Sequence, residues 1–260
     1  MRSTFEPAAA AAGAATSASE KTLLVLEAAL AHPRFTDVVE STGFAKATAH
    51  RIIATLLDRQ FLALGGDGSY LPGPKILSLA GVALQRIDIS AIASRFVDEL
   101  VVQSGCTVHL GAVSGDEIIY LLRADSDRPY VMPSRAGLAV PMHSTGIGKA
   151  ALADLTDDQL DRFVARAGLP RRTAHTLTTP EALRAEIVAV RRLGYALDRE
   201  ENVPGIGCVA APVRDHTGTV AFGVSISTLL LEHTFDQIEA MAPLAVATAA
   251  RISTALGFPS

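Results

Sequence analysis

Apolar residues recur at helical spacing near the start of the chain, at Leu23, Leu24, Leu26, Ala28 and Leu30. Such spacing predicts an amphipathic helix. We expect Ser19 to be its N-cap, since a serine hydroxyl accepts a hydrogen bond from the first turn. The helix should end at His32, because a residue that precedes a proline disfavours the α region.

Two more helices are predicted on either side of Gly43. The first has Thr36 as its cap and the sequence DVVEST as its body. Gly43 then supplies a turn in which a positive φ has no steric cost. The second helix runs from about Lys46 to Arg59, and its apolar residues share one face: Ala49, Ile52, Ile53, Leu56 and Leu57.

The sequence FLALGGDGSYLP follows the third helix and predicts a β-hairpin around its Gly-Gly-Asp-Gly turn. Three helices followed by a hairpin form the layout of a winged helix-turn-helix. In that motif, the start of the second helix of the pair reaches base edges in the major groove, and the hairpin touches the DNA backbone. The predicted DNA-binding residues are therefore Lys46, Thr48, His50 and Arg51 on the helix, and Ser69 and Tyr70 in the hairpin.

Two other interpretations fit the same pattern. Short helices joined by a glycine turn also occur in ordinary helical bundles, and a winged helix can serve as a protein-interaction module. Basic and acidic residues roughly balance over this segment. A single copy would then bind DNA weakly, which favours a dimer that contacts two half-sites.

From Gly73 onward, helical and alternating patterns are mixed. The sequence KILSLAGVALQ predicts a linking helix, and longer amphipathic helices are predicted in ISAIASRFVDELVVQSG, DDQLDRFVARAG and PEALRAEIVAVRRLG. Strands joined by tight turns are predicted in TVHLGAVSGDEIIYLLRA and in CVAAPVRDHTGTVAFGVSIS, with a further strand in PYVMPSRA and the start of a helix in HSTGIGKAALADL. Helices that flank an antiparallel sheet indicate an α+β domain.

Composition limits the remaining classes of protein. The chain has 260 residues, of which 49% are hydrophobic, so a sizeable core can form. Residues 1–18 are rich in alanine and are expected to be a disordered tail. No apolar run is long enough to cross a membrane. The two cysteines have no CxxC spacing, which fits a reducing cytoplasm. The net charge of −4 argues mildly against binding nucleic acid, although a small DNA-reading domain can carry its own local charge.

Three stretches suggest an enzyme, and two of them do not match the motif that they resemble. HSTGIGKA lacks the first glycine and the final Ser or Thr of a phosphate-binding loop. GIGCVA matches GxGxxA, but a strand is predicted after it where a dinucleotide site needs a helix. Cys208 could be a thiol nucleophile in a thiol-dependent enzyme, yet no histidine is paired with it by sequence. The histidines lack metal-ligand spacing, so neither a metal nor another cofactor is expected.

The order of these motifs resembles the IclR family of bacterial transcriptional regulators. The matching stretches are GFAKATAHRIIATLLDRQFL, DGSYLPGPKILSLA, GLAVPMHSTGIGKAALA, GYALDREENVPGIGCVAAPV and GTVAFGVSIS. The resemblance implies a winged helix-turn-helix over residues 19–74, a linker helix over 75–90, and a GAF-like effector-binding domain over 91–260. It also implies a homodimer or homotetramer that binds operator DNA and a small organic effector, as a repressor or an activator.

The candidate effector site combines residue chemistry with this resemblance. Gly146 and Ile147 begin a predicted helix, where backbone N–H groups can bind a carboxylate, and Asp198 can accept a hydrogen bond from a ligand or instead form a surface cap or ion pair. The resemblance places these three in the effector pocket and adds Met132, Val140, Ile206, Cys208, Ser225 and Ser227. Ile147 is larger than the residue common at that family position, so it could shrink the pocket or shift the ligand.

Overall fold

The structure is a computed structural model that describes residues 17–85, 88–127 and 132–259. Most of the expected N-terminal tail therefore lies outside the described residues. The chain divides into two compact units, the first ending at Ile87 and the second beginning at Asp88. Within the described residues, no helix is both long and apolar enough to span a membrane.

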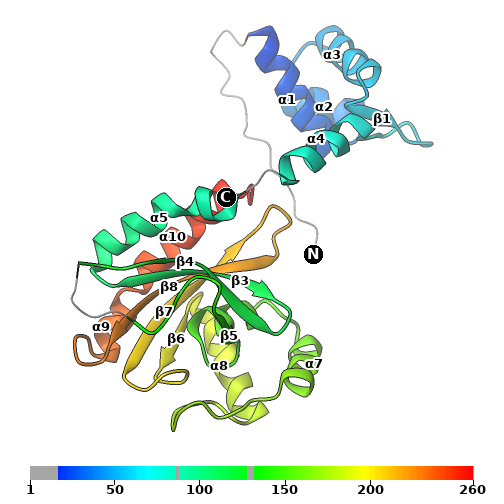
Figure 1. Cartoon of the computed structure of the whole chain (residues 1–260). Coiled ribbons are helices and arrows are strands. Elements are labelled where there is room, and N and C mark those ends of the chain that lie inside the picture. The colour runs from blue at the N-terminus through cyan, green and yellow to red at the C-terminus, as the bar shows by residue number, and fades with distance from the viewer. Residues whose placement is uncertain (1–16, 86–87, 128–131, 260) are drawn as a thin grey trace. The chain divides into compact units, whose positions relative to one another are not determined.

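The first unit is a three-helix domain with a hairpin and a fourth helix (Figure 1). Its elements are α1 (Ala18–Ala31), α2 (Phe35–Thr42), α3 (Lys46–Asp58), β1 (Leu62–Leu64), β2 (Tyr70–Pro72) and α4 (Pro74–Gln85). β1 and β2 pair antiparallel, with Leu62 opposite Pro72. A small core joins α1, α2 and α3, and includes Val25, Val38, Ile53 and Leu56. The expected winged helix-turn-helix layout is confirmed.

Two predicted helix caps are wrong. The N-cap of α1 is Ser17, whose hydroxyl accepts from the Glu20 N–H while the Glu20 carboxylate accepts from the Ser17 N–H. This reciprocal capping box displaces Ser19 into the helix. α2 begins after Arg34, so Thr36 lies in its first turn and its hydroxyl bonds the Asp37 carboxylate. Gly43 ends α2 with φ 65°, as predicted.

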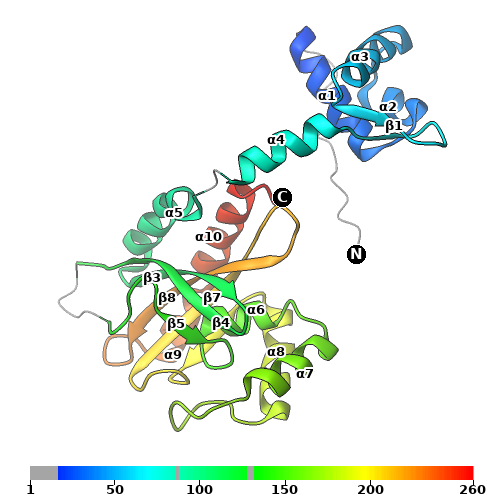
Figure 2. The ribbon, with the colours of Figure 1, turned by 45° about the vertical axis from the view of Figure 1, so that its right-hand side comes forward.

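The second unit is a six-stranded antiparallel sheet between two layers of helices. Its elements are α5 (Ile89–Ser104), β3 (Thr107–Ser114), β4 (Glu117–Ala124), β5 (Ala139–Pro141), α6 (Gly146–Leu152), α7 (Asp157–Ala167), α8 (Pro180–Leu193), β6 (Ala196–Arg199), β7 (Ile206–Arg214), β8 (Val220–Leu229), α9 (Phe235–Ala240) and α10 (Ala242–Ala255). The strand order is β5-β4-β3-β8-β7-β6. α5 and α10 cover one face, and α6 with α8 lies against the other (Figure 2). The predicted α+β class is confirmed.

Alternating residues of each strand enter different cores. Val209, Ala211 and Val213 of β7 pack with α5 and α10 in the larger apolar core. Ala210 faces the opposite way and packs near α6. Because side chains alternate along a strand, Cys208 lies on the same face as Ala210. This second face carries the polar side chains described below.

The strand predicted over residues 129–136 is wrong where the structure describes it. Residues 132–138 are irregular, and the strand β5 forms later, at Ala139–Pro141. The Arg123 guanidinium explains the difference, since it donates to the carbonyl oxygens of Met132 and Ser134. A side chain thus satisfies the backbone groups that a neighbouring strand would otherwise bind.

Candidate functional site

The outer face of α3 carries the candidate DNA contacts. Ala49, Ile52, Ile53 and Leu56 are buried, whereas Arg51 is exposed. Ala47 and Ala54 are also exposed, and helical spacing places them on the Arg51 side of α3. This face therefore presents one long cation between two small side chains, which allows a close approach of the helix backbone to a partner. Ala54 was not singled out from the sequence.

The other predicted α3 contacts flank this face. His50 packs edge-on against the Phe35 ring of α2, with ring centroids 6.1 Å apart. Thr48 is half-buried and, with Arg51, borders a groove of about 430 Å³ between α3 and α1. Lys46 is exposed in the first turn. Lys46 and Arg51 are thus the predicted α3 residues with the freest charged groups.

The hairpin residues have local partners. The Ser69 hydroxyl donates to Asp67 Oδ1 at 2.6 Å, and the Ser69 N–H donates to the same oxygen at 3.1 Å. These bonds lower the pKa of Asp67, so the tip of the hairpin carries a negative charge. The Tyr70 N–H donates to the Pro33 carbonyl at 2.7 Å, and the Tyr70 ring packs beside the small core. Tyr70 therefore joins the hairpin to the segment between α1 and α2.

In the second unit, strand register gathers a row of polar side chains. Asp198 on β6 lies opposite Cys208 on β7, and Cys208 lies opposite Ser227 on β8. His109 on β3 continues the row, because its Nδ1 is 3.3 Å from the Ser227 hydroxyl. Asp198, His109 and Ser227 are all buried. Buried polar groups in one row point to a binding function.

This row lines a cavity of about 170 Å³. Six of the predicted effector residues border the cavity: Met132, Val140, Asp198, Ile206, Cys208 and Ser227. Gly146, Ile147 and Ser225 are buried but lie outside its lining. Sequence reasoning did not single out the other nine residues of the wall: His109, Tyr120, Pro133, Ser134, Leu138, Ala139, Arg172, Asn202 and Val203.

His109 is a neutral member of the cavity wall. Its Nε2 is 2.8 Å from the Ser134 hydroxyl, and its ring stacks on Tyr120 with centroids 4.6 Å apart. Burial, together with the nearby Arg123 guanidinium, lowers the pKa of His109 to about 4. Both ring nitrogens have hydroxyl partners, so the imidazole can donate at one and accept at the other.

Asp198 is bonded to the turn that follows β6, and a buried ion pair lies beside that turn. The Glu201 N–H donates to Asp198 Oδ1 at 2.7 Å. Glu201 Oε1 accepts at 2.5 Å from Lys149 Nζ, which also donates to Glu186 at 2.8 Å and is completely buried. Burial, together with the nearby Glu201 carboxylate, raises the pKa of Asp198 to about 7. Near neutral pH, the Asp198 carboxyl can therefore donate as well as accept a hydrogen bond.

Cys208 lacks the surroundings of a nucleophile. Burial raises the pKa of its thiol, and the Asp198 carboxylate raises it further. A catalytic cysteine needs a thiolate, which a positive neighbour or a base would stabilise. The arrangement suits a packed wall of the cavity. Within the described residues, no group of three His, Cys, Asp or Glu side chains is placed to hold a metal ion.

Ile147 occupies space above the sheet. Gly111 of β3 and Gly223 of β8 are register partners beneath α6. A Cβ at Gly223 would lie 2.6 Å from Ile147 Cγ2, and one at Gly111 would lie 3.3 Å from Ile147 Cδ1. The glycine pair therefore makes room for the isoleucine, whose side chain packs on the sheet and outside the cavity lining.

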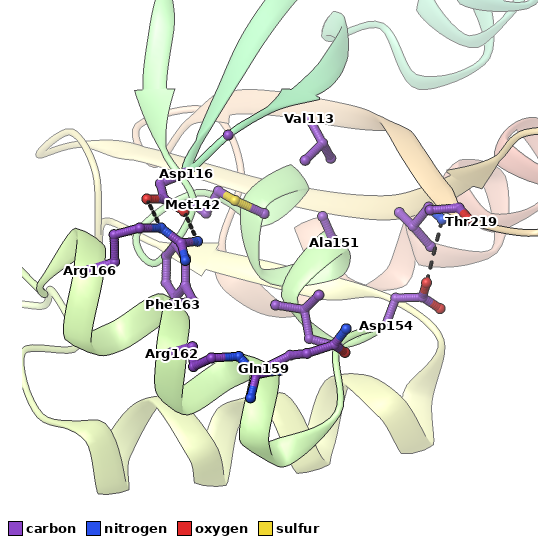
Figure 3. Close-up of a pocket in the computed structure, with 13 residues that line it drawn as sticks. Val113, Asp116, Met142, Ala151, Asp154, Gln159, Arg162, Phe163, Arg166 and Thr219 are labelled. Atoms are coloured by element: carbon purple, nitrogen blue, oxygen red, sulfur yellow. Dashed lines mark hydrogen bonds and ion pairs between the residues drawn. The ribbon is translucent and has the colours of Figure 1, made fainter.

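A second, larger pocket of about 390 Å³ opens between α7 and the sheet (Figure 3). Its wall includes Met142 and Phe163, and its rim carries Asp116 paired with Arg166, whose Nε donates to Asp116 Oδ2 at 2.6 Å. Its charged groups are at the rim, and the buried side chains of its described lining are apolar. The smaller cavity is therefore the stronger candidate for selective ligand binding.

Comparison with known proteins links both units to one family. A sequence model described as "IclR helix-turn-helix domain" matches residues 19–64, and one described as "Bacterial transcriptional regulator IclR C-terminal" matches residues 81–254. The HTH-type transcriptional regulator XynR of Escherichia coli K12 is 31% identical over 228 residues, which cover 87% of this chain and 90% of XynR.

Solved structures of IclR proteins have the same fold as this chain. The Thermotoga maritima IclR matches with a TM-score of 0.63 at 30% identity, over 92% of this chain and 98% of that one. An IclR homologue of Microbacterium hydrocarbonoxydans, crystallised with 4-hydroxybenzoate, matches with a TM-score of 0.58 over 92% of this chain and 99% of that one. The second pair is 21% identical, so that likeness concerns the fold alone.

Proposed function

The chain belongs to the IclR family of bacterial transcriptional regulators, and from this premise we propose how it reads DNA and where it senses its ligand. It is a ligand-responsive DNA-binding regulator with a helix-turn-helix domain and an effector-binding domain. Its relatives are transcriptional regulators, which fits a protein that binds without catalysing a reaction. Such a regulator acts in the bacterial cytoplasm, where the DNA lies.

α3 enters the major groove of the operator, and Arg51 reads a base. The exposed position of Arg51 beside Ala47 and Ala54 carries this proposal. An arginine binds guanine O6 and N7 through two parallel hydrogen bonds. Lys46, Thr48 and His50 contact bases or phosphates nearby, and Ser69 and Tyr70 place the hairpin against the backbone.

The protein works as a dimer or tetramer. Leu77, Leu79 and Val82 of α4 are 68%, 48% and 49% exposed, which is unusual for large apolar residues on one short helix. A second copy that covers this surface would remove it from water. Two DNA-reading domains would then reach two half-sites, which compensates for the balanced charge of one domain.

The cavity beside Asp198 holds the effector. An engineered cavity of about 150 Å³ admits benzene, so a space of this size suits a single ring or a short chain. Effector binding changes the affinity for the operator through coupling of about 1–3 kcal/mol, typical of allosteric proteins.

The test is a footprint of the purified full chain on the DNA that flanks its own gene, at 50 and 200 mM salt. We expect protection of a roughly palindromic site that weakens as salt rises, because phosphate contacts release counterions. A lack of salt-dependent protection on any such fragment would reject the DNA-reading proposal and favour a protein-interaction role for the winged helix.

A further inference from the structure

We infer that Arg172 is the residue that binds the anionic group of the effector, and that the effector is a monocarboxylate the size of a single ring or a short chain. The inference rests on the proposed function of the cavity. It places the binding of the effector's negative group on the loop of residues 168–179, between α7 and α8, instead of at the start of α6.

The first argument is the charge of the cavity wall. Arg172 is the one side chain of the described lining that is always charged, because guanidinium does not release its proton in proteins. His109 is neutral, with its ring nitrogens facing the hydroxyls of Ser134 and Ser227. Burial raises the pKa of both the Tyr120 phenol and the Cys208 thiol, so both stay protonated. A ligand with one negative group is therefore favoured at the Arg172 end.

The second argument is that the Arg172 guanidinium has no partner among the residues that the structure describes. Within the described residues it makes neither an ion pair nor a side-chain hydrogen bond. Its neighbour Arg171 differs, since its guanidinium lies 3.5 and 3.4 Å from the carbonyl oxygens of Thr173 and Ala174, and it does not line the cavity. An unpartnered guanidinium beside a cavity can form two parallel hydrogen bonds with a carboxylate.

The third argument is that the backbone at Arg172 is firmly held. The Arg172 N–H donates to Thr176 Oγ1 at 2.9 Å. The buried hydroxyls of Thr173 and Thr176 donate to the carbonyl oxygens of Glu200 and Glu201 at 2.5 and 2.7 Å. His143 Nε2 donates to the Pro170 carbonyl at 3.0 Å. The backbone of the loop is thus tied to the turn that follows Asp198, which keeps Arg172 beside the cavity while its exposed side chain stays free to meet a ligand.

The start of α6 is a poorer anion site in this chain. The Gly148 N–H is already bonded to the Thr145 hydroxyl, at 3.2 Å. Gly146 and Ile147 lie outside the cavity lining, and the Ile147 side chain packs on the Gly111 and Gly223 pair. An anion in the cavity therefore meets Arg172 before it meets these backbone groups.

The other polar groups of the cavity wall limit the rest of the ligand. Asp198, Ser227 and His109 offer hydrogen bonds there and no positive charge. A hydroxyl or carbonyl group can bind them, whereas a second carboxylate would face the Asp198 carboxyl without a counter-charge. Monocarboxylates are therefore preferred over dicarboxylates of similar length.

The experiment measures binding of defined probes to the full chain by isothermal titration calorimetry. The probes are benzoate, 4-hydroxybenzoate and lactate, each beside its neutral amide. We expect at least one carboxylate to bind the wild type ten-fold or more tightly than its amide. Arg172→Gln should weaken that binding 10- to 100-fold and leave amide binding unchanged, with folding checked by circular dichroism.

Two matched variants serve as controls. Arg171→Gln removes the adjacent cation, and Arg162→Gln removes a cation that lines the second pocket. Both should bind the carboxylates as the wild type does. Equal binding of acid and amide, unchanged binding by Arg172→Gln, loss of binding in Arg162→Gln, or no binding of any carboxylate at 10 mM would each overturn the inference.

The outcome is separable from that of the DNA test. Footprinting of the wild type without any probe decides the DNA-reading proposal alone. If protection is found and carboxylate binding does not depend on Arg172, the regulator stands and the charge recognition is wrong. If protection is absent and Arg172 still binds carboxylates, the cavity is a carboxylate site and the DNA-reading proposal is wrong.

Discussion

Asp198 is the residue whose chemistry depends most on its surroundings. Its carboxyl is 4% exposed and lies near the Glu201 carboxylate, and its pKa is raised to about 7. The unfolded chain has an ordinary pKa near 3.9. Between these values, the folded state keeps a proton that the unfolded state has released. The free energy of unfolding therefore falls as pH rises through this window, and the penalty is absent below about pH 4.

Asp198→Asn should remove this pH dependence, because an amide does not titrate and its oxygen can still accept from the Glu201 N–H. We expect the stability of the variant relative to the wild type to increase by about 2–3 kcal/mol from pH 5 to pH 8. Chemical denaturation of both proteins at each pH measures it. Comparison at equal pH cancels the titration of His109, and a difference that stays constant with pH would contradict the assignment.

Arg51→Ala tests the exposed face of α3. The variant should bind a specific operator about 1–3 kcal/mol more weakly if the guanidinium contacts a guanine. Its binding to unrelated DNA should change much less. Arg59→Ala, at the exposed end of the same helix, is the control and should affect both DNAs alike. Unchanged operator affinity in Arg51→Ala, measured by titration at fixed salt, would show that Arg51 does not contact a base.

At the scale of elements, α6 is positioned by a glycine that no pattern of apolar residues reveals. A Cβ at Gly148 would lie 2.2 Å from the Met142 carbonyl oxygen and 2.3 Å from its Cα. Neither backbone atom can move without shifting the segment after β5. This close approach lets Lys149, the next residue, reach Glu186 on α8 and Glu201 beside the cavity.

Gly148→Ala should therefore destabilise the second unit by several kcal/mol, through a clash with backbone that cannot relax. Gly81→Ala is the matched control, because Gly81 lies within α4 and a Cβ there meets nothing within 4 Å. That change should be neutral or stabilise by up to about 1 kcal/mol, since alanine favours helix. Thermal unfolding of both variants gives the comparison, and equal melting temperatures would contradict the argument.

At the scale of the whole molecule, Leu77, Leu79 and Val82 leave an exposed apolar surface on α4. Monomeric proteins seldom expose several large apolar residues on one helix. The helix has no buried residue among those whose exposure is described. We expect this surface to pair with a second copy, so that operator affinity depends on protein concentration.

Leu77→Glu should weaken self-association ten-fold or more, because a charge would be buried at the shared surface. Leu231→Glu adds the same charge at a side chain that is 96% exposed in the second unit, and should leave association unchanged. Sedimentation velocity over a range of concentrations measures both. A wild type that is monomeric at the concentrations that protect DNA would contradict the proposal.

The sequence by itself determined the local elements. The helical period placed α3 within a residue of its end, the Gly-rich turn placed the hairpin, and Asp215 to Gly218 formed the turn predicted between β7 and β8. The predicted apolar face of α1 was less accurate. Val25 and Ala29 are buried, whereas Leu23 and Leu30, which were predicted to lie on that face, are exposed. The helices α9 and α10 and the strand β6 were not predicted.

Only the tertiary structure decided the composition of the cavity. His109 and Ser227 are 118 residues apart and meet because β3 pairs with β8 in one register. A shift of one residue would turn either side chain to the other face, and register is fixed by packing on both sides of the sheet. Arg172 reaches the wall because threonine hydroxyls tie its loop to the turn at Glu200. Such contacts depend on distant backbone groups, so local sequence could not reveal them.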